Sequence, residues 1–191
     1  KNMVFATLDP TTRKVFLDDG PPAVVTDTVG FIRKLPTQLI EAFKATLEES
    51  AEADILLHVV DLSSPNMERQ VEVVEGLIKE FNWEDKKILH IFNKFDVAPP
   101  DRQFRIKQFP RIFVSALTGH GFEQLKRTMG EMINEMQTQV EMYFSRTDEY
   151  KLYDLSREAK ILRKEAATEG TIIFAMMTPT LMNKWKDYLV K

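Results

Sequence analysis

Short apolar runs alternate with longer amphipathic segments through the middle of the chain. The runs Ile55–Asp61, Lys87–Phe92 and Arg111–Ser115 are each predicted to form a strand, and the continuous apolar character of the first is typical of a strand buried on both faces of a sheet. In Asn66–Phe81 the apolar residues recur at helical spacing, which predicts an amphipathic helix. Because strands that alternate with helices are typical of βαβ units, the pattern predicts an α/β fold with a mostly parallel sheet.

The N-terminal part of the chain has a different pattern. Two short strands, Val15–Leu17 and Ala23–Thr26, are predicted on either side of residues 18–22, where paired aspartates, a glycine and two prolines favour a turn. Residues 37–53 are predicted to form a helix, because large apolar residues recur there every four positions.

The pattern changes again near the C-terminus. Apolar residues at helical spacing predict one long amphipathic helix over Phe122–Phe144. Beyond Thr147 we expect a strand, a helix, a strand and a helix, at Glu149–Tyr153, Ser156–Thr168, Thr171–Met177 and Pro179–Leu189. The sequence therefore predicts two domains, a larger α/β domain over residues 1–147 and a small α+β domain over residues 148–191.

Composition narrows the class of protein. Hydrophobic residues make up 43% of the 191 and charged residues 29%, which is typical of a folded globular protein. Lysine and arginine number 26 against 29 aspartates and glutamates, so the net charge of −3 indicates no bulk nucleic-acid binding, and no DNA partner is expected. The sequence contains no cysteine, and its apolar runs are too short to span a membrane. Because it begins with Lys1, we expect it to be the interior of a longer protein.

The residues Asn93, Lys94, Phe95 and Asp96 directly follow a predicted strand. The Asp96 carboxylate offers two acceptors for the N1–H and N2–H groups of guanine, whereas adenine would leave that carboxylate desolvated and unpaired. In this interpretation Asn93 braces the loop and reaches the base, and the stem of Lys94 lies over the ring. An ordinary polar loop is the alternative interpretation, but the position after an apolar strand favours nucleotide recognition.

Two weaker patterns also lie at strand ends. Asp27 and Gly30 follow the second N-terminal strand, where a carboxylate suits a magnesium ion and a glycine lets an N–H group approach a phosphate. Ser115, Ala116 and Leu117 follow the third strand of the predicted sheet, and a small residue there allows an N–H group to meet guanine O6. Because open α/β sheets bind ligands at the carboxyl ends of their strands, we expect the three patterns to converge on one site.

These motifs resemble those of the HflX family, within the Obg–HflX superfamily of GTPases. Phe5–Arg13 resembles the switch I segment of that family and Asp27–Pro36 its switch II, and the segments Ala42–Glu49 and His58–Asp61 extend the likeness. The resemblance implies a Ras-like P-loop GTPase with a three-layer fold. It also implies GTP or GDP as ligand, Mg²⁺ as cofactor and action on the rRNA and proteins of the 50S ribosomal subunit in the cytoplasm, where the family splits stalled or idle ribosomes.

The resemblance also assigns roles to single residues. Thr7 would ligate Mg²⁺ from switch I, Asp27 would hold the ion through water, and the Gly30 N–H would touch the γ-phosphate. Phe31 stands where many GTPases have a side chain that orients water, so no side chain is expected to be catalytic. None of the seven glycines belongs to a phosphate-binding loop G-x-x-x-x-G-K-[ST]. We therefore expect residues 1–147 to be a GTPase domain from switch I onward that lacks its first strand and helix, and expect this chain alone to bind GTP poorly.

Two other functions fit the same residues. A ribosome-binding module without turnover would keep the loops but hydrolyse no GTP. An Obg-type ribosome-assembly GTPase would share the base-binding motifs. Turnover in the presence of ribosomes would separate the first alternative from a true GTPase.

Overall fold

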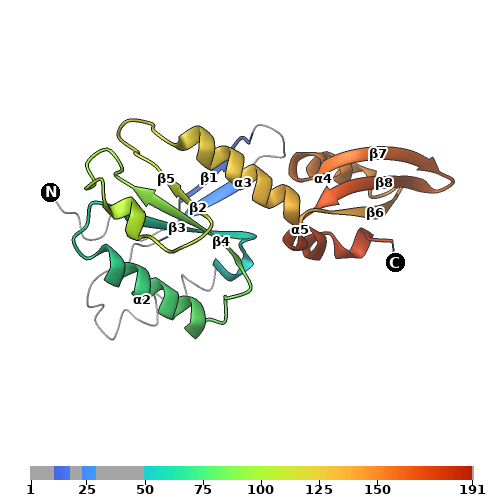
Figure 1. Cartoon of the computed structure of the whole chain (residues 1–191). Helices are drawn as coiled ribbons and strands as arrows, with labels where there is room; N and C mark the ends of the chain where they lie inside the picture. The colour runs from blue at the N-terminus through green and yellow to red at the C-terminus, as the bar shows by residue number, and fades with distance from the viewer. Residues whose placement is uncertain (1–10, 18–22, 29–49, 191) are drawn as a thin grey trace. The chain divides into compact units, whose positions relative to one another are not determined.

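A computed structural model of the chain describes residues 11–17, 23–28 and 50–190. Its strands are β1 Thr11–Val15, β2 Ala23–Asp27, β3 Ile55–Asp61, β4 Lys87–Asn93, β5 Arg111–Phe113, β6 Thr138–Ser145, β7 Lys160–Ala167 and β8 Gly170–Met177. Its helices are α2 Met67–Glu80, α3 Phe122–Met136, α4 Leu152–Glu158 and α5 Pro179–Lys184, with 3-10 turns at Ser50–Glu52, Arg102–Arg105, Glu149–Lys151 and Lys186–Tyr188 (Figure 1). The turn predicted at residues 18–22 and nearly all of the helix predicted at 37–53 lie outside the described residues.

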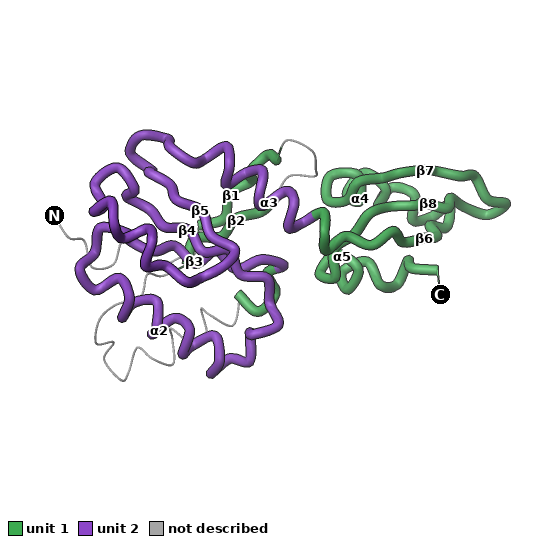
Figure 2. Tube along the Cα trace, viewed as in Figure 1, with its two compact units in different colours: residues 1–53, 134–191 green, residues 54–133 purple. Residues whose placement is uncertain are grey.

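Two compact units divide the chain. Residues 54–133 form one unit, and residues 1–53 together with 134–191 form the other (Figure 2). The second unit includes β6, which lies on the N-terminal side of the domain boundary predicted at residue 148. The C-terminal sheet therefore begins earlier in the chain than the sequence pattern indicated.

The unit of residues 54–133 is built on a parallel sheet of order β3-β4-β5, which confirms the predicted α/β class. The helices α2 and α3 lie on opposite sides of this sheet (Figure 1). The helix predicted over Asn66–Phe81 is confirmed as α2. Apolar side chains from the sheet, α2 and the segment after β4 form one core: Val60, Leu62, Met67, Val71, Phe92 and Ile106.

Burial differs between the two long strands of this sheet. In β4 the four residues Leu89 to Phe92 are buried, because β4 lies between β3 and β5. In β3 only Val60 is buried, and Val59 is 61% exposed. The prediction that β3 is buried on both faces is therefore wrong for the described part of the chain, in which β3 pairs with β4 alone.

The N-terminal strands form an antiparallel hairpin whose register pairs Thr11 with Asp27 and Val15 with Ala23. The predicted first strand, Val15–Leu17, is displaced, since β1 ends at Val15. Leu17 lies just past the strand and is buried, with 7% of its surface exposed. Its apolar character thus indicates burial rather than strand pairing.

The long helix predicted over Phe122–Phe144 is wrong in its second half. The helix α3 ends at Met136, and residues 138–145 form β6, which pairs antiparallel with β8. Met142 and Phe144 are fully buried whereas Glu141 and Tyr143 are exposed, so the side chains alternate as in a strand. Pairing with a strand some thirty residues further on decides the conformation here.

The rest of the C-terminal sheet also corrects the sequence prediction. The strand predicted at Glu149–Tyr153 is a 3-10 turn that leads into α4, and most of the helix predicted at Ser156–Thr168 is the strand β7. The predicted strand Thr171–Met177 is confirmed as β8, the centre of an antiparallel sheet of order β6-β8-β7. Residues from this sheet, α4 and the C-terminal turns form its core: Met142, Phe144, Leu155, Ala159, Ile173, Ala175, Met177 and Trp185.

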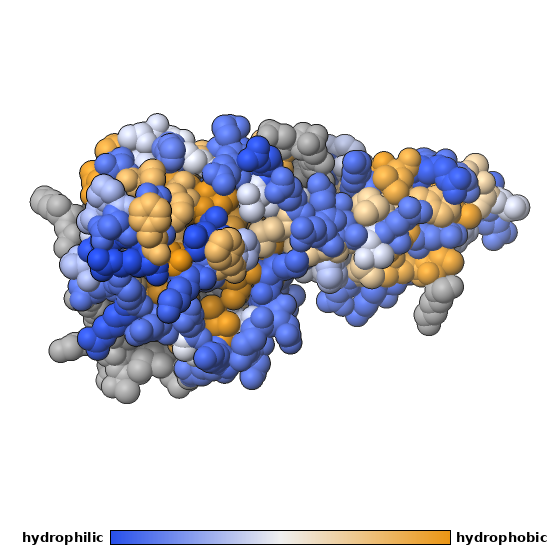
Figure 3. Space-filling model, in the orientation of Figure 1, coloured by the Kyte–Doolittle hydropathy of each residue, from blue (hydrophilic) through white to orange (hydrophobic). Residues whose placement is uncertain are grey.

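The face drawn in Figure 3 shows hydrophobic areas interspersed among hydrophilic ones. The most exposed large apolar side chains of the described residues are Leu117 and Phe104, at 85% and 82%. Within the residues that the structure describes, no helix is long and apolar enough to span a bilayer.

Candidate functional site

The carboxyl ends of β3, β4 and β5 bring polar residues to one edge of the parallel sheet. Asp61 is the last residue of β3 and lies opposite Asn93, the last residue of β4. Beyond β5 the backbone continues beside β4, because the Val114 N–H donates to the Phe92 carbonyl (2.9 Å) and the Phe95 N–H donates to the Val114 carbonyl (3.0 Å). The loops after β4 and β5 therefore leave the sheet side by side.

The side chain of Asn93 joins these two loops. Its Oδ1 atom accepts a hydrogen bond from the Lys94 N–H (2.8 Å) and another from the Ala116 N–H (3.0 Å). The pattern that begins at Asn93 and the pattern that begins at Ser115 are thus brought together, as the sequence predicted. One amide oxygen that satisfies two backbone donors fixes the spacing of the loops.

Lys94 has a backbone conformation that is uncommon for a residue with a side chain, with φ at +62°. This turn carries Phe95 inward and leaves Asp96 exposed. The ring of Phe95 lies 5.6 Å from that of Phe113 and stacks on His120 at 5.2 Å with an interplanar angle of 13°. The loop is anchored on both sides of Lys94, so the Asp96 carboxylate projects from a fixed base.

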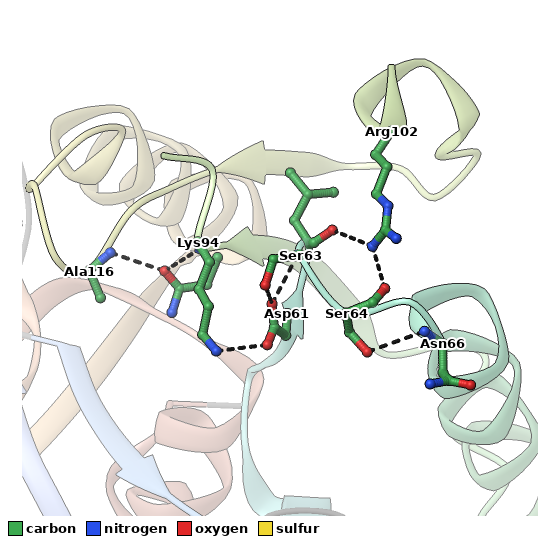
Figure 4. A network of polar contacts seen from close by, with 9 residues as sticks. Asp61, Ser63, Ser64, Asn66, Lys94, Arg102 and Ala116 are labelled. Carbon is green, nitrogen blue, oxygen red and sulfur yellow. Dashed lines mark hydrogen bonds and ion pairs between the residues drawn. The ribbon is translucent and has the colours of Figure 1, made fainter. Parts of the chain in front are cut away.

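The side chain of Lys94 reaches back to β3. Its Nζ donates to Asp61 Oδ2 at 2.8 Å, and the other carboxylate oxygen, Oδ1, accepts from the N–H (2.9 Å) and the hydroxyl (2.6 Å) of Ser63 (Figure 4). Partial burial raises the pKa of Asp61, but the hydrogen bonds from Lys94 and Ser63 together outweigh it and leave the pKa below its ordinary value. Asp61 is therefore an anion at neutral pH.

Sequence reasoning identified Asp61 only as the end of a strand and as part of the family resemblance. The signal that Asp61 belongs to the site is its position at the end of β3. The adjacent parallel strand β4 ends at Asn93, and the two residues are register partners. The register of two strands is not visible in either strand alone.

The loop after β5 is held by its own backbone. Ser115 is fully buried, its N–H donates to the His120 carbonyl (3.0 Å), and its hydroxyl accepts from the Thr118 N–H (3.2 Å). Ala116 and Leu117 form the exposed tip. The buried serine therefore fixes the turn, and the two residues after it are exposed.

The remaining predicted site residues lie elsewhere. Asp27 ends β2, is exposed, and belongs to the other compact unit. Thr7, Gly30 and Phe31 lie outside the described residues. The structure thus brings together two of the three predicted strand-end patterns, and the convergence of Asp27 with them stays a prediction.

The chemistry of the donors is compatible with magnesium, which takes one or two protein oxygens and completes its shell with phosphates and water. Asp27, the predicted carboxylate for this ion, is exposed at the end of β2. In the part of the chain that the structure describes, no group of three or more histidines, aspartates or glutamates could hold a metal ion.

The sequence of this chain is similar to those of known GTPases. A family model described as 50S ribosome-binding GTPase matches residues 1–94. The protein GTPase HflX of Lacrimispora saccharolytica is 37% identical over 188 residues, which cover 98% of this chain and 44% of the relative. The GTPase HflX of Magnetococcus marinus is 38% identical, with 96% of this chain and 43% of the relative covered. The chain thus spans less than half the length of these curated relatives.

A solved structure gives the same picture of the fold. The crystal structure of an SsGBP mutation variant matches with a TM-score of 0.54 and 25% identity, and the match covers 63% of this chain and 47% of that one. Together with the parallel sheet and its flanking helices, this likeness agrees with a Ras-like P-loop GTPase fold.

Proposed function

Because this chain belongs to the HflX family of GTPases, we propose that the protein binds guanine nucleotides and hydrolyses GTP. The observation that carries the proposal is the Asn93 carboxamide, which ties the loop of Lys94 to the loop of Ala116 by two hydrogen bonds. A site that must recognise the flat edge of a purine needs two loops at fixed spacing, and this link supplies it.

We assign recognition of the base to these loops. The exposed carboxylate of Asp96 accepts from guanine N1–H and N2–H, and the turn of Ala116 and Leu117 supplies an N–H group to guanine O6. The apolar stem of Lys94 covers the ring. Adenine offers no matching pair of donors to Asp96, so this arrangement selects guanine over adenine.

The phosphate side of the site is assigned to other residues. Thr7 and Asp27 would hold Mg²⁺, Asp27 through water, and the Gly30 N–H would contact the γ-phosphate. The ion neutralises charge on the phosphates when it is bound. Phe31 has no group that could orient a water molecule, so intrinsic hydrolysis is slow and depends on backbone groups or on an activator.

The ribosome is the partner that the comparisons favour. The matching family model is described as a 50S ribosome-binding GTPase, and we propose that this protein acts on the large ribosomal subunit, in the cytoplasm, in ribosome splitting or rescue. Residues 1–147 would carry the nucleotide-binding functions. The last strand within this range, β6, pairs with β8 and so forms part of the C-terminal sheet. A module that binds ribosomes without turnover and an Obg-type assembly GTPase are the alternatives.

The test uses the protein as its gene encodes it. We expect tighter binding of GDP than of ADP by calorimetry, and GTP hydrolysis that rises when purified 50S subunits are added. Asn93→Ala should weaken GDP binding about tenfold or more, because two backbone donors lose their acceptor. The matched control is Asn66→Ala, since Asn66 is exposed and makes no side-chain cap.

Two results would contradict the proposal in different ways. Equal affinity for GDP and ADP would exclude the guanine site. Guanine-specific binding with hydrolysis at background, even with 50S subunits, would favour the module without turnover.

A further inference from the structure

The ion pair between Lys94 and Asp61 crosses from the end of one parallel strand to the loop after the next (Figure 4). The two strand ends are fixed against each other, because Asp61 and Asn93 are register partners and the Leu62 N–H donates to the Asn93 carbonyl (2.9 Å). Leu62 itself is 1% exposed. The carboxylate and the lysine are therefore presented by backbone that cannot shift easily.

The Asp61 carboxylate has a defined orientation. Ser63 occupies Oδ1 with two hydrogen bonds, so Oδ2 is the oxygen that faces Lys94. Arg102 stabilises the turn that carries Ser63, because its guanidinium donates to the carbonyls of Leu62 (2.9 Å) and Ser64. The 3-10 turn Arg102–Arg105 thus supports the turn after β3 that orients the Asp61 carboxylate.

The Lys94 side chain is the most flexible part of this ion pair, because it is long and more exposed than the Asp61 carboxylate. The side chain of Lys94 is 55% exposed, and an unpaired lysine at that position would sample many rotamers. The pair with Asp61 fixes the Nζ end of this side chain beside the end of β3 (Figure 4). The stem between that end and the loop after β4 consists of apolar methylene groups, which suit the place where the base is assigned.

We propose that Asp61 is a positioning residue for nucleotide binding, which holds the stem of Lys94 in the orientation that packs against the purine ring. This inference rests on the proposed function, since it assigns a further residue to the same site. Asp61 does not contact the base and acts only through Lys94. It raises the affinity for guanine nucleotides by ordering that side chain before the ligand arrives.

A purely structural role is the competing explanation. Asp61 also accepts two hydrogen bonds from Ser63, so it closes the turn after β3 whatever Lys94 does. The two roles differ in one measurable respect. A structural residue affects binding independently of position 94, whereas a positioning residue affects binding only when Lys94 is present.

The experiment is a double-mutant cycle on the protein as its gene encodes it, with GDP as the probe and calorimetry as the readout. Asp61→Asn should raise the Kd for GDP about threefold to fivefold, a modest factor because the pair is half exposed. Lys94→Met should also raise the Kd, and Asp61→Asn should add nothing in the Lys94→Met background. Asp101→Asn is the matched control, since it breaks an equally short ion pair with Arg105 (2.8 Å) and should leave the Kd unchanged.

Thermal unfolding of each variant separates loss of fold from loss of positioning. Lys94→Met breaks the ion pair by changing its more exposed partner. It therefore tests the inference even if Asp61→Asn lowers the melting temperature. Effects of the two substitutions that simply multiply, or a Kd unchanged by Asp61→Asn, would overturn the positioning role while leaving guanine binding intact. A wild-type protein without preference for GDP would instead overturn the proposed function and this inference together.

Discussion

Single residues with unusual backbone geometry shape the loop after β5. Gly119 and Gly121 both have positive φ, at +82° and +78°. At Gly121 a Cβ atom would lie 2.2 Å from the Phe113 carbonyl oxygen, whereas at Gly119 no atom lies within 4 Å. Gly121 therefore allows the loop to pack tightly against β5, and Gly119 supplies only the turn.

Alanine at these two positions should have unequal effects. Gly121→Ala should lower the free energy of unfolding by about 3 kcal/mol or more, because strain at positive φ adds to a clash with backbone. Gly119→Ala should cost only about 1 kcal/mol from the positive φ. Urea unfolding of the two variants measures both values, and equal losses would contradict the close approach at Gly121.

The site residues illustrate what the sequence could predict at this scale. The residue types of Asn93, Asp96 and Ser115 and their positions after apolar strands were sufficient to group them. The ion pair of Lys94 with Asp61 was not predictable, because it depends on the register between two strands. Lys94 was expected over a base, and its interaction with a carboxylate became visible only in the structure.

Between elements, the pairing of β3 with β4 places two histidines opposite each other. His58 and His90 are register partners, and their Nδ1 atoms lie 3.2 Å apart. Burial, and to a smaller extent the neighbouring His90, lower the pKa of His58 to about 4, while Glu75 of α2 opposes them. Burial also lowers the pKa of His90, with Glu75 again opposing. Because both pKa values are lowered, both rings are uncharged in the folded state at neutral pH, and one ring donates its N–H to the other.

Because of this histidine pair, we expect the free energy of unfolding to fall in mild acid. The unfolded chain protonates His58 near its ordinary pKa of about 6.5, whereas the folded chain does so only near pH 4. Protons therefore favour the unfolded state as the pH falls through that window. The free energy of unfolding should drop by about 1–2 kcal/mol between pH 7 and pH 5, and urea titrations at each pH measure it.

The control for this prediction is a histidine at the surface. His58→Gln should reduce the pH dependence of stability between pH 7 and pH 5, and His120→Gln, at an exposed position, should leave it as in the wild type. A pH dependence that His58→Gln does not change would show that the histidine pair does not carry it.

Elements were predicted well where local pattern and tertiary context agree. The strands β3 and β4 and the helix α2 follow from apolar runs and a helical stripe. The strand β6 was missed because Val140 and Phe144 continue the four-residue spacing of α3, while Val140, Met142 and Phe144 also fit the two-residue spacing of a strand. Pairing with β8 resolves that ambiguity, and such a distant partner is not visible in a local pattern.

For the whole molecule, the order of strands and helices was enough to predict the α/β class. The burial of each strand was harder to predict, because it depends on which other segments pack against it. The apolar sequence of β3 suits burial on both faces, yet Val59 is 61% exposed, and β3 pairs with β4 alone among the described strands.

The central claim is that Asp96 recognises the edge of guanine, and one measurement tests it most directly. The Kd values for GDP and XDP are compared by calorimetry between the wild-type protein, as its gene encodes it, and Asp96→Asn. We expect the wild type to prefer GDP and Asp96→Asn to lose about tenfold or more of its GDP affinity while gaining affinity for XDP, because an amide donor meets the xanthine carbonyl where the guanine amino group stood. An unchanged preference for GDP in Asp96→Asn would contradict the account.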